Sequence, residues 1–136
     1  MAQTSAQPRD PLGQPRKRIL VVEDNELNMR LFRDVLVAYG YTPLEIRDGA
    51  RAIEAVRTER PDLVVLDIQL PGMNGMEIGR RLKEDAATRA IPIVAVTAFA
   101  LKADERRVRE TGCEAYLSKP ISLKTFIETV RRLTGK

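Results

Sequence analysis

Residues 61–72 read Pro-Asp-Leu-Val-Val-Leu-Asp-Ile-Gln-Leu-Pro-Gly, and this stretch decides how the rest of the chain is interpreted. The four apolar residues Leu63 to Leu66 run unbroken, which is typical of a parallel strand buried on both faces. Asp67 then stands at the carboxyl end of the strand, where open α/β sheets bind their ligands. On this stretch alone, Asp67 could equally begin a turn or cap a helix. The other segments decide between these readings.

Size and composition indicate one soluble globular domain. The chain has 136 residues, of which 43% are hydrophobic and 31% charged. No apolar run approaches the ~20 residues that span a bilayer, and the N-terminus lacks the apolar core of a signal peptide. A single cysteine excludes an internal disulfide. We therefore expect a cytoplasmic protein without membrane insertion. The absence of histidine also excludes histidine-dependent nucleophiles and histidine metal sites.

The basic charge is concentrated at the N-terminus. Residues 1–18 contain Arg9, Arg16, Lys17 and Arg18 against Asp10, a net +3 of the chain's total of +4. Residues 1–17 are rich in Gln, Pro, Ser and Ala, which predicts a disordered tail or a cloning remnant before a domain over residues 18–136. The domain itself is nearly neutral and has few aromatic residues, so no nucleic-acid partner is expected.

Five short apolar runs alternate with five helical patterns along the chain. The predicted strands cover residues 19–22, 41–46, 63–66, 91–96 and 115–118. The predicted helices follow them, with Asn25 and Ser122 as N-caps, Gly40 as a left-handed terminator and Pro61 as a stop. The third and fourth helices are expected over residues 76–84 and 102–110. This alternation predicts an α/β fold with a doubly wound, five-stranded parallel sheet, for which we expect the flavodoxin-like order 2-1-3-4-5.

Four of the five predicted strands are followed by polar residues whose side chains can take part in catalysis or ligand binding. Glu23 and Asp24 follow the first strand, Asp67 the third, Thr97 the fourth and Lys119 the fifth. Strands one and three are neighbours at the switch point of such a sheet, so these side chains should meet in one crevice. Three carboxylates repel one another unless a cation lies among them or one stays protonated. Oxygen ligands in an open, wet crevice favour Mg²⁺.

This set of residues suits phosphoryl transfer by positioning and charge neutralisation. Asp67 is the better candidate for a nucleophile that forms an acyl phosphate, since it faces Lys119 and Thr97. Asp24 is expected to bind the metal directly, and the longer Glu23 through water. Five unrelated turn or cap residues would not explain why all of them follow strands.

Four motifs resemble the receiver domain of response regulators, over residues 18–133. They are Val21-Val22-Glu23-Asp24-Asn25, the run from Leu66 to Gly75, Ala95-Val96-Thr97-Ala98 and Tyr116-Leu117-Ser118-Lys119-Pro120. The runs over residues 23–29, 95–100, 112–116 and 118–122 further resemble single-domain cell-cycle regulators of the DivK type. The chain departs from many receivers at Glu23, where they have Asp.

The resemblance implies a role for each matching residue. Asp67 would accept a phosphoryl group from a phosphohistidine on a histidine kinase or phosphotransfer protein. Glu23, Asp24 and the backbone carbonyl of Gln69 would organise Mg²⁺ beside Asp67. Lys119 would contact the phosphoryl group. As the switch pair, Thr97 would swing toward that group and Tyr116 would change rotamer with it. The Lys119–Pro120 bond is expected to be cis.

Two hypotheses concern the neighbourhood of Thr97. The face formed by the fourth helix, fifth strand and fifth helix would contact a downstream protein, because Thr97 and Tyr116 border it and Lys102, Arg106, Arg107 and Arg109 make that helix basic. An ordinary solvated face explains these charges equally well. Phe99 would shield the acyl phosphate from water, so Phe99→Ala should speed phosphate loss.

Other readings of the same residues remain open. The chain could be a receiver excised from a hybrid kinase. A phosphatase of the haloacid dehalogenase type also uses an Asp nucleophile after a strand, but it needs a second Asp at the position of Gln69. A scaffold would have no need of Asp67, Thr97 and Lys119, and a DNA-binding regulator would need a further helix-turn-helix. We therefore expect a phosphoacceptor signalling domain rather than an enzyme.

Overall fold

The computed structural model describes residues 16–70, 74–98 and 102–135. The tail predicted over residues 1–17 lies mostly outside this range, and so does Phe99 with its proposed shielding role. Lys17, which the sequence places in the tail, is described, and its carbonyl accepts a hydrogen bond from the N–H of Thr42 at 2.9 Å.

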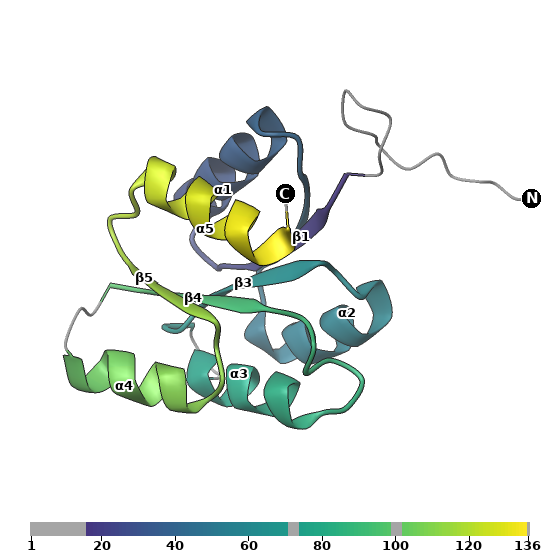
Figure 1. The fold of residues 1–136 in the computed structure, drawn as a ribbon, viewed down its shortest axis with the longest axis vertical. Helices are drawn as coiled ribbons and strands as arrows, with labels where there is room; N and C mark the ends of the chain where they lie inside the picture. The colour runs from purple at the N-terminus through teal and green to yellow at the C-terminus, as the bar shows by residue number, and fades with distance from the viewer. Residues whose placement is uncertain (1–15, 71–73, 99–101, 136) are drawn as a thin grey trace, which may run out of the picture.

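The described chain confirms the predicted alternation of five parallel strands with five α-helices in sheet order 2-1-3-4-5. In Figure 1, α1 and α5 cover one face of the sheet, and α2, α3 and α4 cover the other. A single 3₁₀ turn, η1 (Gly49–Arg51), precedes α2. The elements are β1 (Arg18–Val22), α1 (Glu26–Ala38), β2 (Thr42–Ile46), α2 (Ala52–Glu59), β3 (Leu63–Asp67), α3 (Gly75–Glu84), β4 (Ile93–Thr97), α4 (Lys102–Glu110), β5 (Ala115–Ser118) and α5 (Leu123–Thr134).

The sheet separates two apolar clusters, and its strands are apolar because they contribute to both. Every residue of β3 and β4 is buried, and successive residues point to opposite faces. Ile19 and Val21 of β1 thus pack with α1 and α5, where the Phe32 and Phe126 rings lie 5.1 Å apart. Leu20 packs with α2 and α3 instead. Each such aliphatic side chain stabilises the fold by about 1.5–3 kcal/mol when fully buried.

The predicted caps are observed where the side-chain chemistry requires them. Asn25 Oδ1 accepts a hydrogen bond from the N–H of Asn28 at 2.9 Å, at the start of α1. Ser122 Oγ accepts one from the N–H of Thr125 at 3.2 Å, at the start of α5. Gly40 has φ +90° after α1, as expected of a helix terminator that needs the left-handed region.

Several strand and helix boundaries differ from the prediction by one or two residues, whereas α2 ends before Pro61 as expected. Strand β4 begins at Ile93 rather than residue 91, because the N–H of Ile91 bonds back to the carbonyl of Thr88 at 3.0 Å. Helix α2 ends at Glu59, before Pro61, and Arg60 takes a left-handed conformation with φ 46°. The guanidinium of Arg60 donates to the carbonyl of Ala87 at 3.2 Å. Sequence inspection would expect glycine in that conformation.

Gly75 should be far less tolerant of a side chain than Gly79, although both lie in α3. A Cβ at Gly75 would lie 2.5 Å from the carbonyl oxygen of Asp67 and from Cα of Ile68. A Cβ at Gly79 would meet Sγ of Cys113 at 3.4 Å, an ordinary contact, and alanine improves helix propensity by about 1 kcal/mol. In urea denaturation, Gly75→Ala should lower the free energy of unfolding by about 1–3 kcal/mol. Gly79→Ala should leave it unchanged or raise it. Equal losses would contradict this packing.

Candidate functional site

The parallel register brings the candidate residues to one edge of the sheet. Asp67 is the last residue of β3 and lies opposite Val96 of β4, and Thr97 lies opposite Ser118 of β5. All five strands of the sheet are parallel, so the residues at or just past their carboxyl ends lie on one edge. Glu23 directly follows β1 in the same way, and Lys119 directly follows β5.

Three carboxylates converge at this edge. Glu23, Asp24 and Asp67 each place one oxygen within 4.8 Å of the others. Glu23 and Asp67 are only 1% and 3% exposed, whereas Asp24 is exposed. Burial, and next the charge of Asp67, raise the pKa of the Glu23 carboxyl above its ordinary value of 4.5.

One oxygen of this cluster lacks a hydrogen-bond donor within the described chain. Glu23 Oε2 accepts the N–H of Asn25 at 3.1 Å, but the buried Oε1 accepts no hydrogen bond from any described residue. The amine of Lys119 lies 3.3 Å from Oε1 as an ion-pair partner. A buried charged oxygen without a donor is costly, so this position suits a cation.

Lys119 is the positive group of the cluster. Its Nζ also lies 3.3 Å from Asp67 Oδ2, so the amine bridges two buried carboxylates. Its backbone N–H donates to the carbonyl of Thr97 at 2.7 Å, which fixes the start of the segment after β5. The following Lys119–Pro120 peptide bond is cis. One amine against three carboxylates leaves an excess of negative charge.

Gln69 contacts Asp67 and also reaches the neighbouring strand. Its backbone N–H donates to Asp67 Oδ1 at 2.9 Å, so the carboxylate is held on one oxygen while Oδ2 faces Lys119. Its side-chain Oε1 accepts the backbone N–H of Ala98 at 2.8 Å. From the sequence, we expected a role only for the backbone carbonyl of Gln69. No spacing rule predicts a side-chain bond across 29 residues.

Thr97 and Tyr116 lie along β4 and β5. The side chain of Thr97 is buried, at 2% exposed, at the carboxyl end of β4. Tyr116 is partly buried on β5 and pairs with Ala95, two residues before the level of Thr97. The two residues therefore occupy adjacent strands, with Thr97 at the edge of the sheet where the carboxylates lie.

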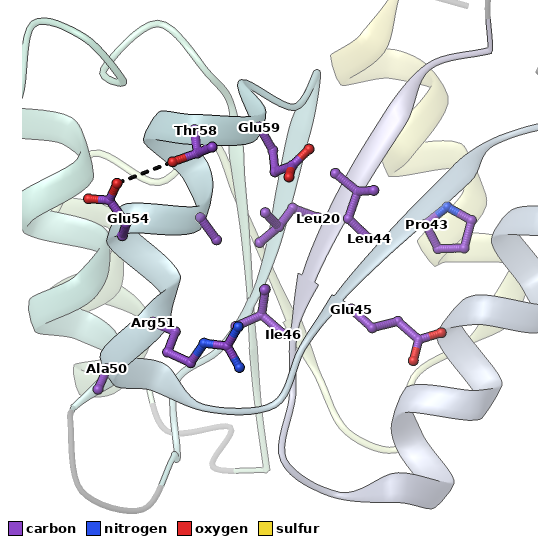
Figure 2. Close-up of a pocket in the computed structure, with 11 residues that line it drawn as sticks. Leu20, Pro43, Leu44, Glu45, Ile46, Ala50, Arg51, Glu54, Thr58 and Glu59 are labelled. Carbon is purple, nitrogen blue, oxygen red and sulfur yellow. Dashed lines mark hydrogen bonds between the residues drawn. The ribbon is translucent and has the colours of Figure 1, made fainter. Parts of the chain in front are cut away.

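A groove of about 700 Å³ lies elsewhere, between the edge strand β2 and helix α2. Figure 2 shows the apolar side chains of Leu20, Leu44 and Ile46 between these two elements. Glu45 points away from α2, and Glu54 is bonded to Thr58 on the same helix at 3.2 Å. The polar side chains of the groove do not converge, so we place the functional site at the carboxylate cluster.

The fold and the carboxylate edge define a receiver domain, and comparison with known proteins agrees. The family model for the response regulator receiver domain matches residues 19–131. The chain belongs to this family.

Curated relatives narrow the similarity to one group within the family. The chain is 53% identical over 119 residues to the polar-differentiation response regulator DivK of Brucella anthropi, covering 88% of this chain and 97% of that protein. It is 52% identical over the same length to DivK of Brucella ovis. It is therefore a receiver domain closely similar to DivK single-domain response regulators.

Solved structures show the same fold. The receiver domain of a sensor histidine kinase from Pseudomonas aeruginosa, with a magnesium ion coordinated in its active-site cleft, is 30% identical, with a TM-score of 0.82 over 89% of this chain and 99% of that one. The receiver domain of a histidine kinase from Syntrophus aciditrophicus is 29% identical, with a TM-score of 0.81 over 88% of this chain and 90% of that one.

Among the described residues, no helix combines the length and apolar composition that crossing a bilayer requires.

Glu23→Gln should stabilise the metal-free protein in a pH-dependent way. A carboxyl whose pKa is raised on folding destabilises the folded protein when it ionises. This destabilisation is present above the raised pKa and absent below 4.5. In EDTA at pH of about 8, Glu23→Gln should raise the free energy of unfolding by roughly 1–3 kcal/mol. This advantage should vanish as the pH approaches 4.5. Urea denaturation across the range measures it.

The exposed Glu84 provides the matched control, because Glu84→Gln removes a carboxylate outside the cluster. It should change the free energy of unfolding little at any pH. A Glu23→Gln protein less stable than the parent at pH of about 8 would contradict the electrostatic description of the cluster.

Proposed function

We propose that the protein is a phosphoacceptor signalling domain that carries a phosphoryl group on Asp67. One observation supports this above all: Asp67 is a buried carboxylate with one oxygen held by the N–H of Gln69 and the other facing the amine of Lys119. The first contact fixes the orientation of the carboxylate. The second places a positive charge where a phosphoryl group on Oδ2 would extend.

A bound Mg²⁺ would complete the site. Asp24, Asp67 and the backbone carbonyl of Gln69 would hold it, and Glu23 would act through water. Glu23 Oε1, which accepts no hydrogen bond from any described residue, and the convergence of three carboxylates within 4.8 Å support this assignment. The metal would supply neutralisation of the charge on the transferring phosphoryl group.

The transfer itself is an in-line displacement at phosphorus. Oδ2 of Asp67 forms the new bond while the bond from phosphorus to the donor's histidine nitrogen breaks, and that nitrogen leaves with the electron pair. Lys119 offsets the negative charge on the phosphoryl oxygens. Thr97 contributes a hydroxyl at the end of the adjacent strand. The donor would be a histidine kinase or a histidine phosphotransfer protein, the usual partners of the family.

Phosphorylation would then shift a conformational equilibrium. Moving a population from 1:99 to 99:1 requires about 5.5 kcal/mol of differential interaction. A phosphoryl group adds one to three charge-assisted hydrogen bonds, each worth roughly 1.5–3 kcal/mol. Contacts to Thr97 and Lys119 could therefore supply most of that energy. Tyr116, on the neighbouring strand, would change rotamer as Thr97 turns toward the phosphoryl group.

The output surface would be formed by α4, β5 and α5. Arg106 and Arg107 are exposed on α4, whereas Val108 is buried against the domain. The β5 strand lies at one edge of the sheet. Tyr116 and Thr97 border this surface, so a rearrangement of their side chains would change its shape.

Phosphoryl transfer to the protein itself is favoured over turnover of a substrate. A haloacid dehalogenase phosphatase uses a second Asp two residues after the nucleophile as its acid and base. Gln69 stands in that position here and cannot donate or accept that proton. We therefore propose no enzymatic activity beyond self-phosphorylation from small phosphodonors and loss of the phosphoryl group.

A receiver belonging to a hybrid kinase is the second candidate. The similarity to the Pseudomonas aeruginosa kinase receiver favours it, at 30% identity over almost all of that domain. The chemistry at Asp67 would be the same in both cases. The intact mass of the protein isolated from its native cells separates the two, because a hybrid kinase would be several times larger.

Incubation with acetyl phosphate and Mg²⁺ tests the central proposal. Intact mass spectrometry should show the gain of one phosphoryl group, because Asp67 needs only a reactive donor and charge neutralisation. Asp67→Asn should abolish the gain, whereas Asp34→Asn, at an exposed position on α1, should retain it. Phosphorylation that persists in Asp67→Asn would refute the assignment.

Charge reversal on α4 tests the output surface. Some proteins in a native lysate should bind only the phosphorylated domain. The double substitution Arg106→Glu with Arg107→Glu should lower the recovery of these proteins by at least about tenfold, because charges at an interface contribute to electrostatic complementarity with the partner. Quantitative mass spectrometry of the captured proteins measures it. The matched control is Arg51→Glu with Arg89→Glu, which reverses two exposed charges away from α4. Equal recovery with both pairs would contradict the proposed surface.

A further inference from the structure

Gln69 joins the two loops that leave the carboxyl ends of β3 and β4. Its backbone N–H holds Oδ1 of Asp67 at 2.9 Å, and its side-chain Oε1 holds the N–H of Ala98 at 2.8 Å. Ala98 directly follows Thr97, the last residue of β4. One residue thus contacts both the acceptor carboxylate and the backbone next to the buried threonine.

The contact to Ala98 is not needed to complete the sheet. The ladder between β3 and β4 already closes with the N–H of Ile68 donating to the carbonyl of Val96 at 2.9 Å. The carbonyl of Thr97 is taken by the N–H of Lys119 at 2.7 Å. The bond from Ala98 to Gln69 therefore lies one step beyond the regular hydrogen-bonding pattern. It restrains the first peptide group after β4.

We propose that the Gln69 side chain is a latch: it holds Ala98 in the unphosphorylated conformation and thereby disfavours the phosphorylated conformation. This inference rests on the proposed phosphoacceptor role of Asp67. Gln69 is a positioning residue here, because it acts through the peptide group beside Thr97.

A phosphoryl group on Asp67 would compete with the latch directly. It places charged oxygens at the edge of the sheet where β3 and β4 end, one strand away from the Ala98 N–H. Hydrogen bonds to charged acceptors are roughly twice as strong as those to neutral ones. The amide oxygen of Gln69 is neutral, so the phosphorylated state would favour release of Ala98 from it.

Removal of the latch should shift the conformational equilibrium toward the phosphorylated conformation. By linkage, any interaction present only in the unphosphorylated conformation weakens binding of a ligand that requires the other one. A neutral hydrogen bond contributes a net factor of roughly two- to tenfold in such an equilibrium. Loss of the latch should therefore raise affinity for a phosphoryl mimic by up to this factor.

Gln69→Met tests the latch, because methionine has similar length and no amide oxygen. With saturating Mg²⁺, we expect it to bind beryllium fluoride, a mimic of the phosphoryl group on a carboxylate, about two- to tenfold more tightly than the parent protein. Amide hydrogen exchange measured by NMR without the mimic should be faster at Ala98 by a similar factor. If the substitution instead disrupted the whole site, the affinity for beryllium fluoride would fall.

Thr88→Val is the matched control, because Thr88 Oγ1 donates a buried hydrogen bond of 2.7 Å to the carbonyl of Leu82, in the loop after α3. It should lower the melting temperature and leave the affinity for beryllium fluoride unchanged. Unchanged or weaker binding by Gln69→Met, or unchanged exchange at Ala98, would overturn the latch. Failure of the parent protein to bind beryllium fluoride would instead refute the phosphoacceptor role of Asp67.

Discussion

The excess of negative charge at the carboxyl edge of the sheet is the constraint on which the rest of this structure depends. Glu23 and Asp67 are almost fully buried beside Asp24, and among the described residues the amine of Lys119 forms ion pairs with both of them. Such a cluster costs stability in the resting protein. The parallel sheet holds it together, because β1, β3 and β5 deliver their carboxyl ends to the same place. This excess of negative charge is what supports our proposal that the site takes a cation and a phosphoryl group.

The two halves of the core support this edge of the sheet from both faces. Strands β3 and β4 are buried along their whole length between two layers of helices. The site residues lie at the ends of these strands, and Gln69 and Lys119 tie them together by hydrogen bonds and ion pairs. Gln69 contacts both the carboxylate of Asp67 and the backbone beside Thr97. In the proposed mechanism, the domain would combine a fixed acceptor with one displaceable contact.

Much of this arrangement was predictable from the sequence because it depends on local patterns. The five-stranded parallel sheet followed from the alternation of elements, and the meeting of Asp67 with Lys119 followed from the positions of both at strand ends. The side-chain bond from Gln69 to Ala98 was not predictable, since it depends on how two loops face each other. The left-handed Arg60 was missed because propensity rules assign that conformation to glycine. Lys83 joins Glu114 at 2.7 Å across 31 residues, another contact that only tertiary packing sets.

A crystal structure of the protein with Mg²⁺ and beryllium fluoride would show whether Asp67 is the phosphoacceptor. We expect beryllium fluoride on an oxygen of Asp67, the metal in contact with Asp24 and Asp67, and the amine of Lys119 within hydrogen-bond distance of a fluoride. Beryllium fluoride on a different carboxylate, or a metal bound away from Asp24 and Asp67, would contradict it.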